Sequence, residues 1–357
     1  MPYSNMFSYN IGLLGPSGIG KTSLLTSIFL ETQLFEKQNG LRFSLYPTNQ
    51  ETSEKIKAAS LQFDRAVALK EFNPIPGSSE SSKFEVRLEL QNGDLAESFD
   101  IDFMDYRGGD LLKDLSQIET TEWFRKMVKS RDLFVPIDAV VIMEYVKRKD
   151  SDILASLGLA RVEEIIKRWA ENMDDSSPYT LAFVPIKVET YSASDNMKQL
   201  RDAIFDLYYS RIKDVLEGKP NLIVQFNPVE TYGCVELEHT DWKPPVLTQK
   251  FKIVRKREDE KITPSIQGAA NLMLAIFRKR HTTTIKVFEK RISELKLKLN
   301  PGNKFVKMLI DKIPFVRRGT KQELAAILSK KEYYEEIMAK LTSSFEKTSS
   351  EIWKEMK

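Results

Sequence analysis

A glycine-rich stretch near the start of the chain, Gly15 to Thr22, has the residue types and spacing of a phosphate-binding loop. It reads Gly-Pro-Ser-Gly-Ile-Gly-Lys-Thr and fits the pattern G-x-x-x-x-G-K-[ST]. Its glycines let backbone N–H groups point at phosphate oxygens, where a side chain would intrude. Lys21 is predicted to reach the β- and γ-phosphates, and the Thr22 hydroxyl to hold Mg²⁺. The predicted nucleotide-binding residues of this stretch are Gly15, Ser17, Gly18, Ile19, Gly20, Lys21, Thr22 and Ser23.

The segments on either side of this loop favour the same interpretation. Phe7 to Leu14 is an apolar run typical of a buried strand, and Thr22 to Leu34 is an amphipathic run typical of a helix. Such a helix would add free N–H groups and the positive end of its dipole to the loop. The alternative is a glycine-rich turn that binds nothing, and the strand–loop–helix order disfavours it.

A second candidate stretch follows a predicted β-hairpin. Phe84 to Leu90 alternates apolar and polar residues, Asn92-Gly93 is a turn signal, and Ser98 to Met104 is the return strand. The return strand ends in Asp105-Tyr-Arg-Gly-Gly109. Beside a triphosphate, the aspartate would hold the Mg²⁺ shell, and the Gly108 N–H would bond the γ-phosphate and release it after hydrolysis. A plain turn is the alternative.

The remaining periodicity predicts an α/β fold. Apolar runs alternate with runs of helical spacing, which indicates a mostly parallel sheet covered on both faces, with ligands at the carboxyl ends of its strands. Residues 41–46 are a candidate strand, and 246–255 an extra hairpin or edge strand. The expected strands after the hairpin are 139–143, 180–188 and 221–229. The expected helices are 54–69, 111–131, 153–173 and 197–216.

In this order, the motifs resemble the Ras-like, translation-factor-related class of P-loop GTPases. Gly15 to Thr22 matches the first motif of that class, and Asp105 to Gly108 matches the third. Ile186-Lys187-Val188-Glu189 falls at a strand end where the class carries [NT]-K-x-D, which binds guanine. Val229 to Gly233 falls where a short loop supports the base. The doubled glycine after Asp105 and the Pro-Gly-Ser-Ser loop before the hairpin are most similar to a bacterial branch sometimes called double-GTPases.

The resemblance implies a fold and a set of ligands. The fold is the three-layer P-loop NTPase fold, an α/β structure whose mostly parallel sheet has one antiparallel hairpin strand, here with a helical C-terminal appendage. The ligands are GTP or GDP and Mg²⁺, with Lys187, Glu189 and Thr231 at the base. Glu189 replaces the aspartate of the class, and Ile186 its Asn or Thr. A carboxylate accepts from N1–H of guanine and disfavours adenine, which has no donor there. An ordinary polar strand end is the alternative.

The first switch of the class carries a threonine that closes over Mg²⁺. Ser78 or Ser79 is the nearest match here, with Thr48 and Thr52 as rivals. The resemblance therefore adds a third expected ligand to the Mg²⁺ site, whose members are Thr22, Asp105 and Ser78.

The position that orients the attacking water also departs from the class. Small GTPases usually carry glutamine after the glycine of the third motif, and this chain carries Gly109. Arg107 lies in the same segment and is a candidate catalytic arginine or a surface residue. Slow hydrolysis without an activator is therefore expected. The expected catalytic residues are Lys21, Asp105, Arg107 and Gly108.

Charge is unevenly distributed along the chain. The net charge is +3, yet residues 278–331 hold 16 Lys and Arg against 4 Asp and Glu. We expect a GTPase domain over 1–299 and a basic helical region over 300–357. An acidic membrane, nucleic acid or an acidic partner are candidate ligands of 278–331, and a packed helix with a solvated basic face is the alternative. The helical stretches expected in this part are 264–299, 305–313, 321–328 and 332–356.

The composition argues against several other classes. The single cysteine, Cys234, excludes an internal disulfide and fits a reducing compartment. The two histidines, His239 and His281, have no Cys or His neighbours, which argues against a zinc site. No apolar run reaches the length of a membrane span, and the first residues lack the pattern of a signal peptide. We therefore expect a cytoplasmic protein.

The leading hypothesis is a slow, Mg²⁺-dependent GTPase switch whose C-terminal helices contact a protein partner or activator. Two alternatives stay open at this point. One is an ATP-using P-loop enzyme in which the residues at 187 and 189 match by chance. The other is a nucleotide-bound scaffold that does not hydrolyse its ligand.

Overall fold

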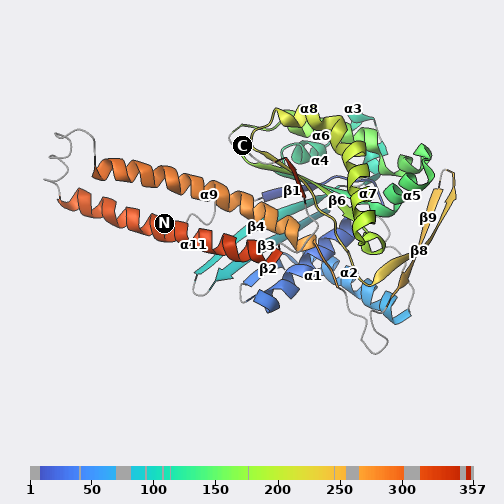
Figure 1. Ribbon diagram of the computed structural model, residues 1–357, viewed down its shortest axis with the longest axis horizontal. Coiled ribbons are helices and arrows are strands. Elements are labelled where there is room, and N and C mark those ends of the chain that lie inside the picture. Colours follow the sequence, from blue (N-terminus) through green and yellow to red (C-terminus); the bar gives the residue numbers. More distant parts are fainter. Residues whose placement is uncertain are drawn as a thin grey trace. The chain divides into compact units, whose positions relative to one another are not determined.

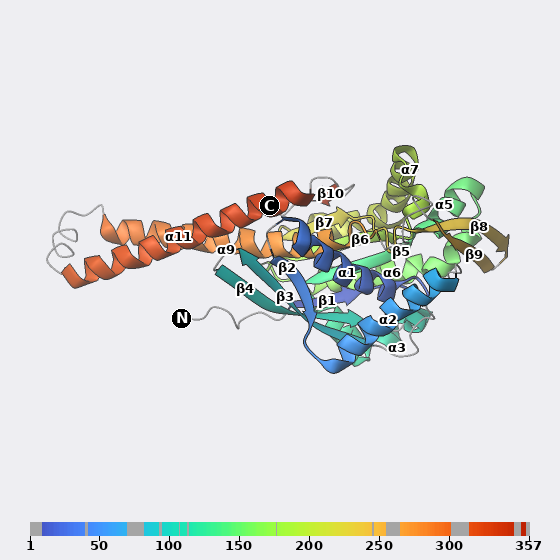
Figure 2. The same ribbon diagram turned by 90° about the horizontal axis from the view of Figure 1, so that it is seen from below.

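The computed structural model describes residues 9–39, 42–69, 82–92, 95–106, 108–112, 114–175, 177–244, 246–254, 265–300, 314–345 and 351–354. Two compact units are present, which we call unit 1 (residues 1–273 and 348–357) and unit 2 (residues 274–347). The two units divide between Met273 and Leu274, inside helix α9 (Ala269–Leu299), whereas the sequence led us to expect a division at residue 299. Figures 1 and 2 show the elements of both units from two directions.

Unit 1 is an α/β structure built on one mixed sheet. Its helices belong to the segments between the strands, as the alternation of sequence patterns predicts. The sheet strands are β1 (Tyr9–Leu13), β2 (Arg42–Pro47), β3 (Ser82–Asn92), β4 (Leu95–Asp105), β5 (Asp132–Asp138), β6 (Tyr179–Ile186), β7 (Leu222–Phe226) and β10 (Glu351–Lys354). The helices are α1 (Lys21–Asn39), α2 (Gln50–Leu69), η2 (Gly108–Leu112), α3 (Leu115–Glu119), α4 (Glu122–Met127), α5 (Ala139–Arg148), η3 (Ser151–Leu157), α6 (Leu159–Glu171), η4 (Glu189–Tyr191), α7 (Ser194–Ile204), η5 (Phe205–Tyr209) and α8 (Ser210–Glu217).

The sheet is mostly parallel, as predicted. Its strand order is β10-β7-β6-β5-β1-β4-β3-β2. Strands β4, β1, β5, β6 and β7 run parallel, and β3 runs antiparallel to both of its neighbours, β2 and β4. The β3–β4 pair is the predicted hairpin. Because β1, β5 and β6 lie side by side, the segments after their carboxyl ends meet at one edge of the sheet.

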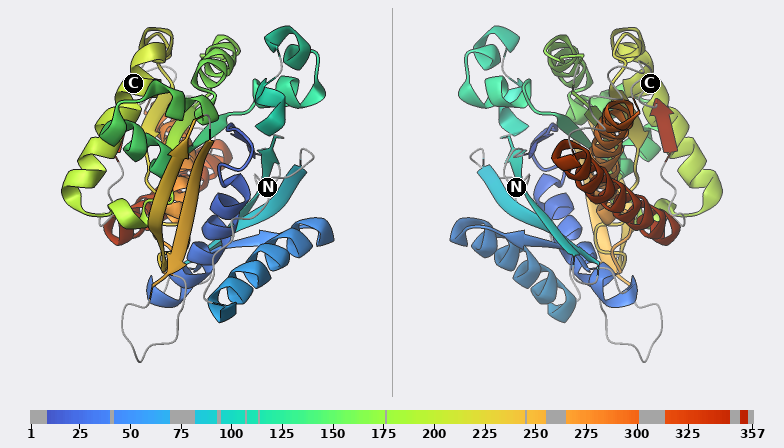
Figure 3. Two further views of the ribbon diagram at one scale, coloured as in Figure 1. Left: turned by 90° about the vertical axis from the view of Figure 1, so that its right-hand side faces the viewer. Right: turned by 90° about the vertical axis from the view of Figure 1, so that its left-hand side faces the viewer.

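Apolar layers cover both faces of this sheet. Every residue of β5 and of β6 is buried, which is typical of central parallel strands. Leu133, Val135 and Ile137 belong to one large apolar cluster together with residues of α4, α5, α6 and α8. Phe134 and Val184 are also buried, and they lie on the opposite face because side chains alternate along a strand. Figure 3 shows helices on either side of the sheet.

The helix predicted at 111–131 is divided into η2, α3 and α4. Two other segments adopt a different type of secondary structure from the one predicted. Residues 139–143, predicted as a strand, begin helix α5, because the strand β5 ends at Asp138 and the Asp138 carboxylate accepts hydrogen bonds from Val140 N (2.9 Å) and Val141 N (3.2 Å). A continuous apolar run does not distinguish the two states. Residues 351–354, predicted as helix, form strand β10, which gains an antiparallel ladder along the edge strand β7.

A second, two-stranded sheet follows the main one in unit 1. Its strands β8 (Val235–Lys243) and β9 (Val246–Ile253) pair antiparallel with each other. The segment 246–255, expected to form an extra hairpin or an edge strand, supplies only the second strand of this hairpin, and the first strand was not predicted.

Unit 2 is a pair of long helices. Within this unit, α9 and α11 (Pro314–Phe345) run side by side (Figures 1 and 2). Ion pairs of Arg291 with Glu323 (2.7 Å) and of Lys331 with Glu289 (3.0 Å) link them. Helix α11 is continuous over the two stretches predicted at 321–328 and 332–356, up to residue 345, and the stretch predicted at 305–313 lies outside the described residues. Among the residues that the structure describes, no helix is long and apolar enough to cross a bilayer.

Candidate functional site

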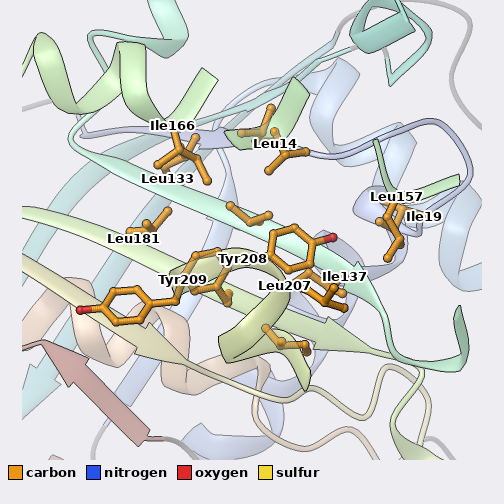
Figure 4. Packing of buried hydrophobic residues seen from close by; sticks show 14 of the residues in the cluster. Leu14, Ile19, Leu133, Ile137, Leu157, Ile166, Leu181, Leu207, Tyr208 and Tyr209 are labelled. Carbon is orange, nitrogen blue, oxygen red and sulfur yellow. The ribbon is translucent and has the colours of Figure 1, made fainter. Parts of the chain in front are cut away.

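The glycine stretch forms the connection between β1 and α1. Gly18 (φ 76°) and Gly20 (φ 108°) have left-handed backbone conformations that L side chains rarely adopt. A Cβ on Gly20 would also lie 2.6 Å from Ile186 Cδ1, so the Ile186 side chain would have to shift to admit it. Leu14 precedes the loop and Ile19 lies within it, and both side chains belong to the apolar cluster of unit 1 (Figure 4). The loop is therefore anchored to the core at both ends.

Lys21, the first residue of α1, folds back over the loop. Its Nζ donates to the carbonyl oxygens of Gly15 (3.0 Å) and Pro16 (3.2 Å). The same nitrogen lies 3.8 Å from Asp105 Oδ1, and the side chain is 6 % exposed. Burial lowers the pKa of Lys21, and the nearby Asp105 charge partly opposes that shift. A buried cation of this kind gains stability from any anion that enters the loop.

Asp105 ends strand β4 and lies directly opposite Leu13 of the neighbouring strand β1. Burial raises the pKa of its carboxyl group, while the charge of Lys21 and a hydrogen bond from Thr22 lower it. Its Oδ1 atom is buried and has no hydrogen-bond partner among the described residues. Such an oxygen is costly to bury, so a cation at this point would stabilise it.

Gly108 brings the second motif directly onto the first. A Cβ on Gly108 would lie 1.9 Å from Ser17 N and 2.2 Å from Pro16 C. These distances are too short for any side chain, so only glycine fits at this position. The backbone after Asp105 therefore touches the glycine loop. Arg107 and Ser78, which the sequence places in the catalytic and metal sets, lie outside the described residues.

Lys187 and Glu189 follow the end of β6, at the same sheet edge. Lys187 has a left-handed backbone (φ 61°), and Glu189 begins the short helix η4. Glu189 Oε1 accepts hydrogen bonds from Tyr232 N (2.9 Å), Gly233 N (3.3 Å) and the Thr231 hydroxyl (3.2 Å). Burial raises the pKa of Glu189, and the bonds from the backbone amides partly offset that effect. The structure thus joins the two predicted base-binding segments, and it uses one carboxylate oxygen to do so.

A single pocket connects the loop with these residues. Its empty volume is about 500 Å³, part of it open to solvent. Its wall combines apolar and polar side chains, as small-molecule sites do. The lining residues are Gly18, Gly20, Ser23, Ile186, Lys187, Glu189, Thr231, Tyr232, Val235 and Phe251.

Several of these residues were not found from the sequence. Tyr232 is one position from the predicted Thr231, so the segment was found but this ring was not. Val235 and Phe251 come from the β8–β9 hairpin, and Asp138, which pairs with Lys187, comes from the end of β5. The only signal for Phe251 was an alternating run that has no link in sequence to the other motifs.

No cluster of three or more His, Cys, Asp or Glu side chains suited to a metal occurs in the part of the chain that the structure describes. Thr22 and Asp105 are therefore a sparse ligand set. Mg²⁺ is often held by one or two protein oxygens together with phosphate oxygens and water, so this set suits a metal that arrives with a nucleotide.

Comparison of the chain with protein-family models gives no match, and comparison with curated proteins gives none. What the site does must therefore be inferred from its geometry.

Proposed function

We propose that unit 1 binds GTP with Mg²⁺ and hydrolyses it slowly, as a P-loop NTPase that serves as a molecular switch. The observation that supports this most is the continuity of one pocket from the glycine loop to Lys187 and Glu189. Gly18, Gly20 and Ser23 of the loop segment lie at one end of this pocket, and Lys187 and the Glu189 carboxylate lie at the other. A purine nucleoside triphosphate has the complementary order of a phosphate chain, a sugar and a flat base.

At the phosphate end, the loop amides and Lys21 bind and orient the triphosphate. Lys21 exchanges the carbonyl oxygens of Gly15 and Pro16 for β- and γ-phosphate oxygens. Thr22 and Asp105 would hold Mg²⁺, and the Asp105 Oδ1 without a hydrogen-bond partner supports that fit. When bound, the metal neutralises charge on the phosphate oxygens.

At the base end, Lys187 and Phe251 supply wall area for a planar ring, and Glu189 supplies acceptors for the guanine N–H groups. The three bonds that Glu189 accepts from residues 231–233 all go to Oε1, so Oε2 takes no part in them. A carboxylate held in this way favours guanine over adenine, because adenine offers no N1 donor.

Hydrolysis is proposed to be slow. Gly109 follows Gly108, so this position has no side chain that could orient water. The close approach of Gly108 to Ser17 supports a role for this segment in sensing the γ-phosphate. The segment and the γ-phosphate would compete for the same space beside the loop. A protein activator that supplies a catalytic group would raise turnover by about 10³- to 10⁵-fold.

For unit 2 we propose peripheral contact with an acidic membrane surface. Lys296, Lys298, Arg318 and Lys321 are exposed and make no ion pair with another described residue. Arg291 and Lys331, by contrast, are paired with glutamates. Each exposed cation near an anionic membrane contributes about 1 kcal/mol to binding.

The test of the nucleotide proposal is a competition between GTP and ATP for the purified protein in the presence of Mg²⁺, followed by phosphate release. The expected result is tighter binding of GTP and slow release of phosphate. Equal or tighter binding of ATP would overturn the choice of guanine and favour an ATP-using enzyme. Tight GTP binding without phosphate release, with or without candidate partners, would favour a scaffold.

A further inference from the structure

We infer that the β8–β9 hairpin is a working part of the base pocket, in which Gln249 and Phe251 position Lys187 and control how long the nucleotide stays bound. The inference rests on the proposed function and extends it, because it assigns the regulation of nucleotide release to a hairpin outside the recognised motifs. Gln249 is a positioning residue, and Phe251 is a lining residue of the pocket.

The first observation is a closed ring of three polar side chains. Lys187 Nζ donates to Asp138 Oδ2 and to Gln249 Oε1 (3.0 Å). Gln249 Nε2 donates to the same Asp138 Oδ2 (3.0 Å). The three residues come from the end of β5, the turn after β6, and β9. Each side chain contacts the other two, so displacement of any one of them removes one bond from each of its partners.

Asp138 is the fixed point of this ring. It is mostly buried, and its other oxygen, Oδ1, already accepts from the amides of Val140 and Val141 at the start of α5. The carboxylate therefore cannot rotate without uncapping a buried helix. This rigidity passes to the Lys187 ammonium, whose long side chain would otherwise lose considerable rotamer entropy when it became ordered.

Lys187 needs such support. Its left-handed backbone (φ 61°) is unfavourable for a residue with a side chain, by about 1–2 kcal/mol. The conformation persists because the surrounding contacts hold it. This left-handed conformation lies between the end of strand β6 and the short helix that begins at Glu189. The ring therefore holds the position from which the lysine contacts a base.

The second observation is the placement of Phe251. Residues Leu247, Gln249 and Phe251 alternate with the exposed positions 246, 248, 250 and 252, so β9 presents one face to unit 1 and the other to solvent. Phe251 lines the pocket, and its ring centroid lies 5.7 Å from Lys187 Nζ. Val235, on the partner strand β8, lines the same wall. The hairpin thus contributes both the apolar wall and the support of Lys187.

The attachment of the hairpin makes it suited to transmit a movement. Among the described strands, β8 and β9 pair only with each other, not with the main sheet. Besides the ring, Leu237 N donates to the Thr190 hydroxyl (2.8 Å), and Trp242 Nε1 donates to Asp150 Oδ2 (2.8 Å). A force on the outer face of the hairpin would therefore act on Lys187 through Gln249.

The experiment measures the release rate of fluorescent GDP from the full chain by displacement with excess unlabelled GDP. Gln249→Ala should speed release by about five- to tenfold, the equivalent of one ordinary hydrogen bond. Phe251→Ala should speed release by at least about tenfold through loss of its ring from the wall. Thr248→Ala, on the outward face of the same strand, is the matched control and should match wild type within about twofold.

A double-mutant cycle separates positioning from general loosening. In a Lys187→Met background, Gln249→Ala should change release by less than about twofold, because the ammonium that Gln249 positions is then absent. An unchanged effect of Gln249→Ala in that background would overturn the inference. If Phe251→Ala fails to fold, Phe251→Leu serves instead, with an expected smaller increase in the same direction. Wild-type release rates in both Gln249→Ala and the Phe251 variant would also overturn it.

The outcomes distinguish this inference from the proposed function. If the wild-type chain binds no nucleotide, both are overturned. If wild type binds GDP, Lys21→Ala loses it, and the Gln249 and Phe251 variants release it at the wild-type rate, only the role of the hairpin is overturned.

Discussion

At the scale of single residues, the most restricted positions are glycines whose neighbours lie closer than any side chain allows. Gly20 and Gly108 were both predicted from motif spacing. The structure adds the reason, since Gly20 faces Ile186 and Gly108 faces the backbone of Ser17. A pattern can indicate that glycine is needed, but the atom that excludes a side chain comes from a strand or loop far away in the sequence.

Gly108→Ala tests this close approach. The added methyl would meet backbone atoms of the loop, which cannot rotate away as a side chain can. We expect a loss of about 2 kcal/mol or more in the free energy of unfolding, measured with denaturant, together with weaker GTP binding. Gly218→Ala is the control, because a Cβ there meets no atom within 4 Å and the backbone is right-handed (φ −68°). Equal stability of the two variants would contradict the packing described for Gly108.

The residues around the proposed base site show where prediction from the sequence ends. Lys187 and Glu189 were predicted because they fall at a strand end where the class that the sequence resembles carries [NT]-K-x-D. Asp138, Gln249 and Phe251 were not found, because their relation to Lys187 depends on the neighbouring strand β5 and on how the β8–β9 hairpin folds back. No spacing in the chain encodes a contact between residues 62 positions apart.

At the scale of elements, the helix after the glycine loop, α1, is connected to the start of helix α9. Glu31 of α1 accepts hydrogen bonds from Gly268 N (3.0 Å) and Ala270 N (2.7 Å), and so caps the first turn of α9. Burial raises the pKa of this glutamate from 4.5 to about 7, although the amide bonds oppose the shift. The two helices thus share a group that titrates near neutrality.

Glu31→Gln tests this connection through its pH dependence. A raised pKa means that the folded state holds the proton more tightly, so the stability from protonation is full below pH 4.5 and is lost as the pH rises to about 7. The free energy of unfolding of wild type, measured by thermal unfolding, should therefore fall by on the order of 1–3 kcal/mol over that pH window, relative to that of Glu31→Gln. Glu54→Gln, on an exposed face of α2, is the control. Parallel pH profiles for wild type and Glu31→Gln would contradict the shift.

Elements were predicted well where local signals agree. The β3–β4 hairpin has clean alternation and a turn dipeptide, and α2 has helical spacing over its whole length. The wrong predictions have a common cause. At 139–143 an apolar run suited two states and the cap at Asp138 decided, and at 351–354 pairing with β7 decided. In both cases the deciding contact is not a property of the segment itself.

At the scale of the whole molecule, the chain combines an α/β unit that carries the pocket with a helical unit that carries the excess of positive charge. The α/β class and the mostly parallel sheet follow from the alternation of patterns. The extent of α11 did not follow, because three polar residues at 329–331 interrupt the apolar spacing without interrupting the helix.

The charge of unit 2 has a direct test with lipid vesicles. Replacing Lys296, Lys298, Arg318 and Lys321 with glutamine should weaken binding to vesicles that contain phosphatidylserine by at least about tenfold, because each cation contributes about 1 kcal/mol. Raising the salt concentration should weaken wild-type binding in the same way. A charge-matched control replaces four exposed lysines of unit 1, Lys129, Lys147, Lys198 and Lys213. Equal binding by the two variants would contradict a membrane role for unit 2.

The most direct measurement is a calorimetric titration of the full chain with GTP and Mg²⁺, compared with Lys21→Ala and with Lys198→Ala, an exposed lysine of α7. We expect about one GTP per chain for wild type and for Lys198→Ala, and a loss of affinity of about 100-fold or more for Lys21→Ala, since we propose that its ammonium binds the phosphates. Wild-type affinity in Lys21→Ala would show that the glycine loop does not hold a triphosphate.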